Sequence, residues 1–276
     1  MEYRNILVHL DESKSARTRL DVALCVAKRH GAHVSALFAP VVPEHDAAYA
    51  LILDAEYWSL YRREHEACRR NLEHHFFARL AEAELKGNWR TASHAQHELL
   101  MRARFADLIV LGQSNPDDLD ASLSDRFQTR VTLSAGRPVL WVPYEGGFPT
   151  VGEHIMVAWD AGQSATRALF DALPFMRLAQ RTELVTFTPA PKDRERIPGA
   201  DIGLVLARHG LEVQVTELHP PPTVTVGEAL LSRAGKTDCD LIVMGAYGHA
   251  RWKELLLGGV TQTVLGAMPV PVLMSH

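Results

Sequence analysis

Short apolar runs alternate along the chain with longer stretches in which apolar residues recur at helical spacing. Residues 154–159 form an apolar run typical of a strand buried on both faces, and residues 163–178 follow a period of three to four. In the second half the pattern predicts further strands at 182–188, 211–218, 241–244 and 270–274, and further helices at 201–209, 226–234 and 261–267. Strands that alternate with helices indicate βαβ crossovers and a parallel sheet.

Two short motifs occur twice at one fixed offset. The run DLIVLG at 107–112 returns as DLIVMG at 240–245, and PVL at 138–140 returns as PVL at 271–273, each 133 positions later. Two motifs at an identical offset are the mark of an internal repeat, which has to be recognised before the fold is assigned.

The repeat predicts two tandem doubly wound α/β domains, each a five-stranded parallel sheet flanked by helices. The strand that ends in Asp11 corresponds to the strand that ends in Asp160, 149 positions later. The first half therefore holds 16 extra residues, which we place in the helical stretch 49–85. A Gly- and Pro-rich linker separates the predicted domains, residues 1–146 and 152–276.

Composition narrows the functional classes. The 276 residues are 47% hydrophobic and 22% charged, and the net charge is −4 with no basic run, which argues against a nucleic-acid binder. No apolar stretch is long enough for a membrane span, and the N-terminus lacks a signal-peptide pattern. Cys25, Cys68 and Cys239 lie far apart without a CxxC pair, as reduced thiols of a cytoplasmic protein do.

The second half carries a glycine pattern suited to an anionic ligand. A strand ends at Met244, Gly245 and Gly248 follow, and after nine more residues Gly258 and Gly259 open a helix. Glycines without a Cβ let the backbone turn sharply and approach a ligand closely. The N–H groups at a helix N-terminus, together with the helix dipole, favour phosphate. Asp160, at the end of the first strand, can accept hydrogen bonds from ribose hydroxyls or the adenine amine.

This pattern, Gly-x2-Gly-x9-Gly between a strand and a helix, resembles the nucleotide-binding signature of the universal stress protein family. The first predicted strand of each half ends in Asp, as in that family, and the DLIVMG and PVLM strands also resemble it. The resemblance covers essentially the whole chain, once per half. The resemblance implies a five-stranded parallel αβ sandwich, ATP or another adenine nucleotide in the binding members, dimerisation and a cytoplasmic stress role.

The resemblance also assigns residues to the nucleotide. They are Asp160 for the ribose or adenine, Met244 and Gly245 beneath the nucleotide, and Gly248, Gly258, Gly259 and Val260 around the phosphates. Gly259 departs from the family pattern, which has Ser or Thr there. A hydrogen bond to a charged group contributes about 1.5–3 kcal/mol. Because the backbone N–H groups remain, we expect binding to be weakened and not abolished.

The first half departs further from the pattern. Gly112 is kept, but the next three positions of the motif are Asn115, Asp125 and Arg126, and the loop adds the carboxylates Asp117, Asp118 and Asp120. Carboxylates beside a polyphosphate are repulsive, so we predict that this half does not bind ATP and acts as a structural partner for the second. Since Asp11 is retained, another small ligand stays open.

We therefore predict a regulatory stress-response protein that binds ATP, with or without Mg²⁺, in its C-terminal domain; ADP and AMP stay open. No catalytic residue or metal site is predicted, and His94 and His97 are interpreted as surface histidines. We predict that the protein is not an enzyme, with weak ATP hydrolysis left open. The expected partners are the nucleotide, the other domain of the chain and a second copy in a homodimer. The alternatives are a scaffold protein that binds no nucleotide and an enzyme of the wider adenine-nucleotide α-hydrolase group.

Overall fold

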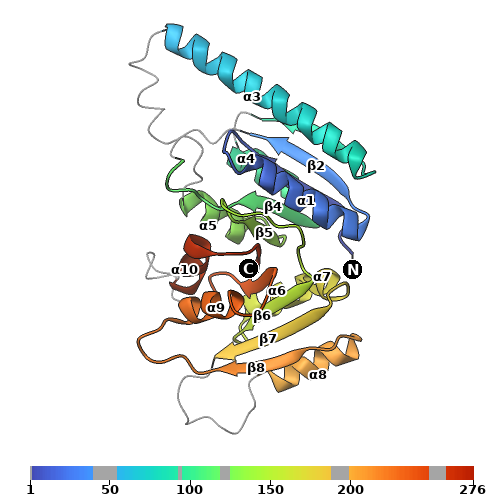
Figure 1. The fold of residues 1–276 in the computed structure, drawn as a ribbon, viewed down its shortest axis with the longest axis vertical. Coiled ribbons are helices and arrows are strands. Elements are labelled where there is room, and N and C mark those ends of the chain that lie inside the picture. Colours follow the sequence, from blue (N-terminus) through green and yellow to red (C-terminus); the bar gives the residue numbers. More distant parts are fainter. Residues whose placement is uncertain (1, 40–54, 93–94, 119–124, 188–198, 249–258) are drawn as a thin grey trace. The chain divides into compact units, whose positions relative to one another are not determined.

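The structure is a computed structural model and describes residues 2–39, 55–92, 95–118, 125–187, 199–248 and 259–276 (Figure 1). Contacts within the chain divide it into two compact units. Tyr3–Arg137 form the first unit, and Pro138–His276 form nearly all of the second. They are called the N-terminal and C-terminal units below.

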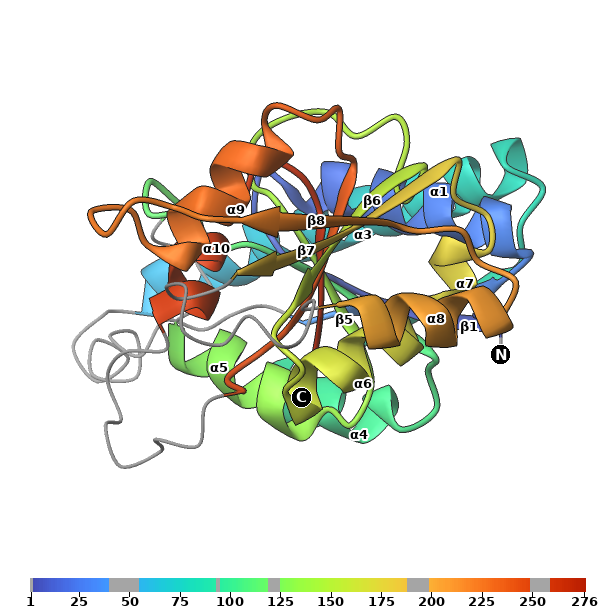
Figure 2. The same ribbon diagram turned by 90° about the horizontal axis from the view of Figure 1, so that it is seen from below.

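The N-terminal unit is a parallel sheet with helices on both faces. Its elements are β1 (Asn5–Leu10), α1 (Ala16–His30), β2 (His33–Phe38), α3 (Ala55–Glu82), β3 (Gly87–Thr91), α4 (Ala95–Ala103), β4 (Leu108–Gly112) and α5 (Asp125–Ser134). The strand order is β3-β2-β1-β4, with every pair parallel. Helices α1 and α3 cover one face, and α4 and α5 cover the other (Figure 2). The extra residues of the first half take part in α3, a helix of 28 residues inside the predicted stretch.

The C-terminal unit repeats this plan and adds two strands, β5 and β10. Its elements are β5 (Val139–Val142), β6 (His154–Trp159), α6 (Gln163–Asp171), α7 (Leu173–Met176), β7 (Arg181–Phe187), α8 (Ala200–Arg208), β8 (Gln214–Leu218), α9 (Val226–Ala234), β9 (Leu241–Gly245), α10 (Gly259–Ala267) and β10 (Val272–Ser275). Strands β10-β9-β6-β7-β8 are all parallel, and β5 pairs with β10 in the antiparallel sense. The predicted α/β class, with mostly parallel strands between helices, is confirmed.

Strand β5 lies before the predicted linker in the sequence, yet its contacts place it in the C-terminal unit. Division of the chain by contacts thus differs from division by repeats. The domain bounds 1–146 and 152–276 stay a prediction.

One predicted helix is wrong. Residues 163–178 were expected to form a single helix, but the chain breaks at Ala172 into α6 and the short α7. Pro174 lies in the first turn of α7, where its missing N–H is harmless. Within a continuous helix its ring would clash with the carbonyl group four residues earlier, so the helix has to end before it.

The aspartate that opens each DLIV repeat has a structural role. Asp107 Oδ2 accepts hydrogen bonds from the backbone N–H groups of Arg4 and Asn5, both at 2.9 Å. Asp240 accepts three such bonds, from Gly152, Glu153 and His154, at 2.9–3.0 Å. Each carboxylate therefore joins the start of one central strand to the chain entering its neighbour, at the edge of the sheet away from the predicted nucleotide site.

The described residues show no metal cluster: no group of three or more His, Cys, Asp or Glu among them could hold an ion. His97 lies on α4, and His94 falls outside the described residues. In the parts of the chain that the structure describes, every helix is too short or too polar to cross a membrane.

Candidate functional site

The carboxyl ends of β6 and β9 meet where the strand order of the C-terminal unit reverses. The chain continues from β6 to β7 on one side, whereas β9 lies on its other side, with Val157 opposite Val243. In open α/β sheets, ligands bind in the crevice outside such a point. Asp160 directly follows β6 and Gly245 ends β9, so the fold brings both parts of the predicted motif to one edge of the sheet.

Asp160 is held in a tight turn and is exposed to solvent. Its Oδ1 accepts a hydrogen bond from the backbone N–H of Gly162 at 2.8 Å, and Ala161 between them has a left-handed φ of 60°. An ideal Cβ at Gly248 would lie 4.0 Å from Asp160 Oδ2. An exposed carboxylate beside this glycine can accept hydrogen bonds from the hydroxyl and amine groups of a ligand.

Gly245 has a packing reason to be glycine. An ideal Cβ at this position would lie 2.4 Å from the backbone N of Ala165 and 2.5 Å from the carbonyl carbon of Ser164. Both atoms belong to the first turn of α6, which therefore approaches the end of β9 more closely than any side chain allows. Met244, one position earlier, is buried in the core, with Met274 as its partner on β10.

Gly248 lies in more open surroundings than Gly245. An ideal Cβ there would be 3.5 Å from both Cβ and Oγ of Ser164, which is ordinary van der Waals contact. The adjacent Tyr247 has a left-handed φ of 54°, and its backbone N–H donates to Thr261 Oγ1 at 3.3 Å. The turn after β9 is therefore tied to α10 by the buried hydroxyl of Thr261.

Helix α10 begins at Gly259, which is exposed. Among the residues that the structure describes, no atom lies within 4 Å of an ideal Cβ at this glycine. The first N–H groups of a helix have no partner within the helix, so this turn can face an anion. Val260 is half-buried in the same turn. Gly258 lies outside the described residues, so its predicted contact has no structural description.

Two further side chains that lie outside the predicted motif border this site. Ser164 is buried, and its Oγ lies 3.4 Å from Nδ1 of His276. The same Nδ1 lies 2.9 Å from the carbonyl oxygen of Ala246, so it donates there as an N–H. No local motif points to His276, because its position depends on the pairing of β10 with β9, where Ser275 is opposite Gly245.

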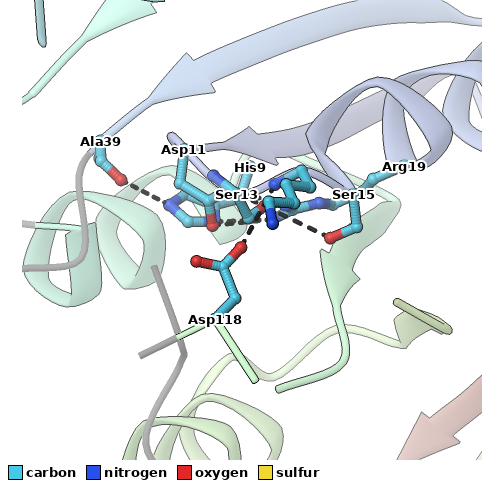
Figure 3. A network of polar contacts seen from close by, with 8 residues as sticks. His9, Asp11, Ser13, Ser15, Arg19, Ala39 and Asp118 are labelled. Atoms are coloured by element: carbon cyan, nitrogen blue, oxygen red, sulfur yellow. Dashed lines mark hydrogen bonds and ion pairs between the residues drawn. The ribbon is translucent and has the colours of Figure 1, made fainter. Parts of the chain in front are cut away.

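The corresponding edge of the N-terminal unit holds a buried network of charges (Figure 3). Arg19, on α1, donates from Nη2 to Asp11 Oδ1 at 2.8 Å and from Nη1 to Asp11 Oδ2 at 3.2 Å. Its Nη2 also donates to Ser13 Oγ at 2.8 Å, and its Nη1 lies 3.3 Å from Nδ1 of His9. His9 Nε2 lies 2.8 Å from the carbonyl oxygen of Ala39. This geometry fits a neutral His9 that donates to Ala39 and accepts from Arg19.

The network perturbs the two titratable groups beside Arg19. Burial lowers the pKa of His9, and the positive charge of Arg19 acts in the same direction, whereas Asp11 and the bond to Ala39 oppose it. Burial alone would raise the pKa of Asp11. The charge of Arg19, with hydrogen bonds from Arg19 and Ser13, outweighs that effect and holds this pKa below its usual value. Asp11 is therefore a carboxylate paired inside the protein.

A small polar pocket remains next to this network. Its lining residues are Asp11, Ser13, Ser15, Arg19, Gly112, Gln113, Asn115 and Asp118. Asp118 Oδ2 accepts a long hydrogen bond of 3.4 Å from the backbone N–H of Lys14, which places one carboxylate of the predicted acidic loop at this pocket. The acidic residue Asp120 lies outside the described residues.

Comparison with known proteins gives one consistent family. The model of the universal stress protein family matches the chain twice, over residues 2–143 and 152–276. The universal stress protein Slr1230 of Synechocystis sp. is 24% identical over 299 residues, covering 98% of this chain and 99% of that protein.

Two solved structures share the fold over nearly the whole chain. A universal stress protein from Archaeoglobus fulgidus aligns over 98% of this chain and 97% of its own, with 17% identity and a TM-score of 0.70. A putative universal stress protein from Pseudomonas aeruginosa covers 99% of this chain and 93% of its own, with 18% identity and a TM-score of 0.63. A universal stress protein in complex with cAMP matches 45% of this chain at 20% identity, with a TM-score of 0.33. With two family matches that together span nearly the whole chain, this protein belongs to the universal stress protein family, as a tandem member.

Proposed function

We propose that the C-terminal half of this stress protein binds an adenine nucleotide, ATP in the first place, and that its role is regulatory. The observation that carries the proposal is the exposed carboxylate of Asp160 beside Gly248, at the point where the strand order reverses. A carboxylate there can accept the hydrogen bonds of ribose hydroxyls, and Gly248 leaves room for close approach of the backbone.

The phosphates are proposed to lie toward the N-terminus of α10. Gly259 in its first turn is exposed and carries no side chain of its own, so its backbone N–H can face the anion. The family includes nucleotide-binding members, one of which was solved in complex with cAMP.

Calorimetric unfolding with and without Mg-ATP tests the proposal. At 100 times its Kd, a ligand stabilises the unit that binds it by about 2.7 kcal/mol. For a unit of this size that corresponds to roughly 8–10 °C in the melting temperature. Parallel scans with ADP and AMP identify the preferred nucleotide. Absence of any shift at millimolar Mg-ATP, ADP and AMP would refute nucleotide binding.

The site itself is tested by Gly248→Asp, with Gly266→Asp as the matched control. Position 248 accepts a Cβ at ordinary contact distance, so the variant should fold, but its carboxylate would repel phosphate and sit beside Asp160. Gly266 is exposed on α10 with open space around it, so the same charge there should leave the ATP shift intact. An ATP shift that persists in Gly248→Asp would place the nucleotide elsewhere.

A scaffold that binds no nucleotide is the second candidate function. Gly259 lacks the hydroxyl of the family pattern, which is the observation that favours it. ATP hydrolysis by the purified protein above the rate of a heat-denatured sample would instead support an enzyme. Location in the cytoplasm and homodimer formation stay predictions, to be tested by cell fractionation and by sedimentation.

A further inference from the structure

The two halves build the same turn around their strand-end aspartates. In the N-terminal half the backbone N–H of Ser13 donates to Asp11 Oδ1 at 3.1 Å, and in the C-terminal half Gly162 donates to Asp160 Oδ1 at 2.8 Å. The offset of 149 residues that aligns Asp11 with Asp160 also aligns Ser13 with Gly162. The two carboxylates are therefore structurally equivalent, and their surroundings can be compared directly.

Their surroundings differ in accessibility. Asp11 is only 1% exposed and Asp160 is exposed, although both follow the first strand of their repeat. What covers Asp11 is the guanidinium group of Arg19, itself 1% exposed, which engages both carboxylate oxygens. At the same offset the second half has Ala168, which cannot reach the carboxylate.

The guanidinium also fills the space above the retained glycine of the first half. An ideal Cβ at Gly112 would lie 2.9 Å from Cζ of Arg19 and 3.1 Å from its Nε. Gly112 is thus glycine because a planar cation lies against it, whereas Gly245 is glycine because the first turn of α6 does. The same glycine of the repeat serves two different packing arrangements.

We propose that the strand-end site of the N-terminal half is a guanidinium-binding site whose occupant is supplied by the chain itself, Arg19. The groups that hold it are two carboxylate oxygens of Asp11, the hydroxyl of Ser13 and Nδ1 of a neutral His9. All four are acceptors arranged around the forked N–H groups of one planar cation, a geometry that an ammonium ion does not match. The half therefore needs no diffusible ligand, and its Asp11 is not available to a nucleotide.

Chemical complementation tests the proposal without reference to nucleotide binding by the other half. Arg19→Ala removes the internal cation and leaves Asp11 buried, and we expect the N-terminal unit to melt about 10–15 °C lower. Millimolar methylguanidinium should then raise the melting temperature saturably, and methylammonium at the same concentration should not. Wild type, with the site filled, should show no saturable gain.

The double variant Asp11→Asn/Arg19→Ala is the control, because it removes the charge that would attract the added cation. An equal methylguanidinium response in the single and double variants would overturn the proposal, as would an Arg19→Ala protein as stable as wild type. If Arg19→Ala does not fold, refolding in methylguanidinium decides: recovery of the native circular dichroism supports the proposal, and no recovery, or equal recovery in methylammonium, refutes it.

Discussion

Replacement of Gly245 by alanine separates two explanations for the glycine that ends β9. If the glycine serves close packing, as the geometry indicates, the added methyl group should destabilise the protein in the absence of any ligand. If it serves only ligand approach, stability should hold and nucleotide affinity should fall. Gly248→Ala, three positions later, is the matched comparison, since its methyl group meets only ordinary contacts.

The size of the effect follows from the distances. The new Cβ at position 245 would lie 2.4 Å from the backbone N of Ala165, against about 3.5–4.0 Å for a relaxed contact, so α6 has to move away from β9 by about 1 Å. Overpacking of this kind costs about 1–3 kcal/mol. For a unit of this length we expect the melting temperature to fall by roughly 3–10 °C. Gly248→Ala should leave stability unchanged or raise it by up to about 1 kcal/mol.

Differential scanning calorimetry of both variants without nucleotide, supported by urea denaturation, measures this difference. Alanine also restricts the unfolded chain, which contributes about 0.4–1 kcal/mol in the opposite direction at both sites. The contrast between the two variants is therefore the quantity to compare. Equal melting temperatures of Gly245→Ala and Gly248→Ala would refute the packing argument. A selective loss of ATP affinity in Gly245→Ala would then restore the ligand explanation.

Three further predictions concern the two strand-end sites. Gly259→Ser adds a hydroxyl at the exposed start of α10 and should tighten Mg-ATP binding, by about tenfold for each 1.4 kcal/mol gained. Calorimetric titration measures the Kd, with Gly266→Ser as the control. A Kd unchanged by Gly259→Ser would contradict this prediction. The pKa of His9 is lowered in the folded protein, so as the pH falls below about 6.5 the imidazole is protonated in the unfolded chain before it is protonated in the folded one. The N-terminal unit should then lose up to about 1.4 kcal/mol per pH unit until the folded-state pKa is passed, and urea titrations of His9→Gln should lack this slope. Position 168 follows Asp160 by eight residues, as Arg19 follows Asp11, so the arginine of Ala168→Arg should pair with Asp160 and weaken ATP binding by about tenfold or more. Ala168→Leu is the control, and the folded protein should bind ATP more tightly than Ala168→Arg does. Equal ATP affinities of the two variants would contradict this prediction.

The sequence predicts the strands and their common direction well, because each is a short apolar run bounded by turn residues. The predicted strand 154–159 and helix 226–234 match β6 and α9 residue by residue. The single helix expected over 163–178 is wrong, since apolar spacing continues smoothly through Pro174 while the backbone cannot. Periodicity reports which face is buried and carries no information about a missing N–H group.

The site was harder to predict than the fold. Glycine spacing points to the end of β9, but it could not distinguish packing at Gly245 from ligand approach, since both require a missing Cβ. The repeat offset places Arg19 opposite Ala168, and yet no local pattern shows that this arginine reaches Asp11. It does so because helical side chains lean toward the N-terminus of their helix, so a residue in the first turns of α1 extends back toward the strand end.

Under the proposed function, these two sites separate stability from ligand response within a duplicated domain. A buried carboxylate needs a partner, because an unpaired charge in the interior is strongly unfavourable. In the N-terminal half Arg19 meets that need permanently, so Asp11 stays paired whatever the solution contains. Asp160 avoids the same need by staying exposed to water, and a ligand that covers it has to supply the hydrogen bonds that water gave. A response to nucleotide is therefore expected from the half whose carboxylate is hydrated, because only there can a ligand from solution be the group that covers it.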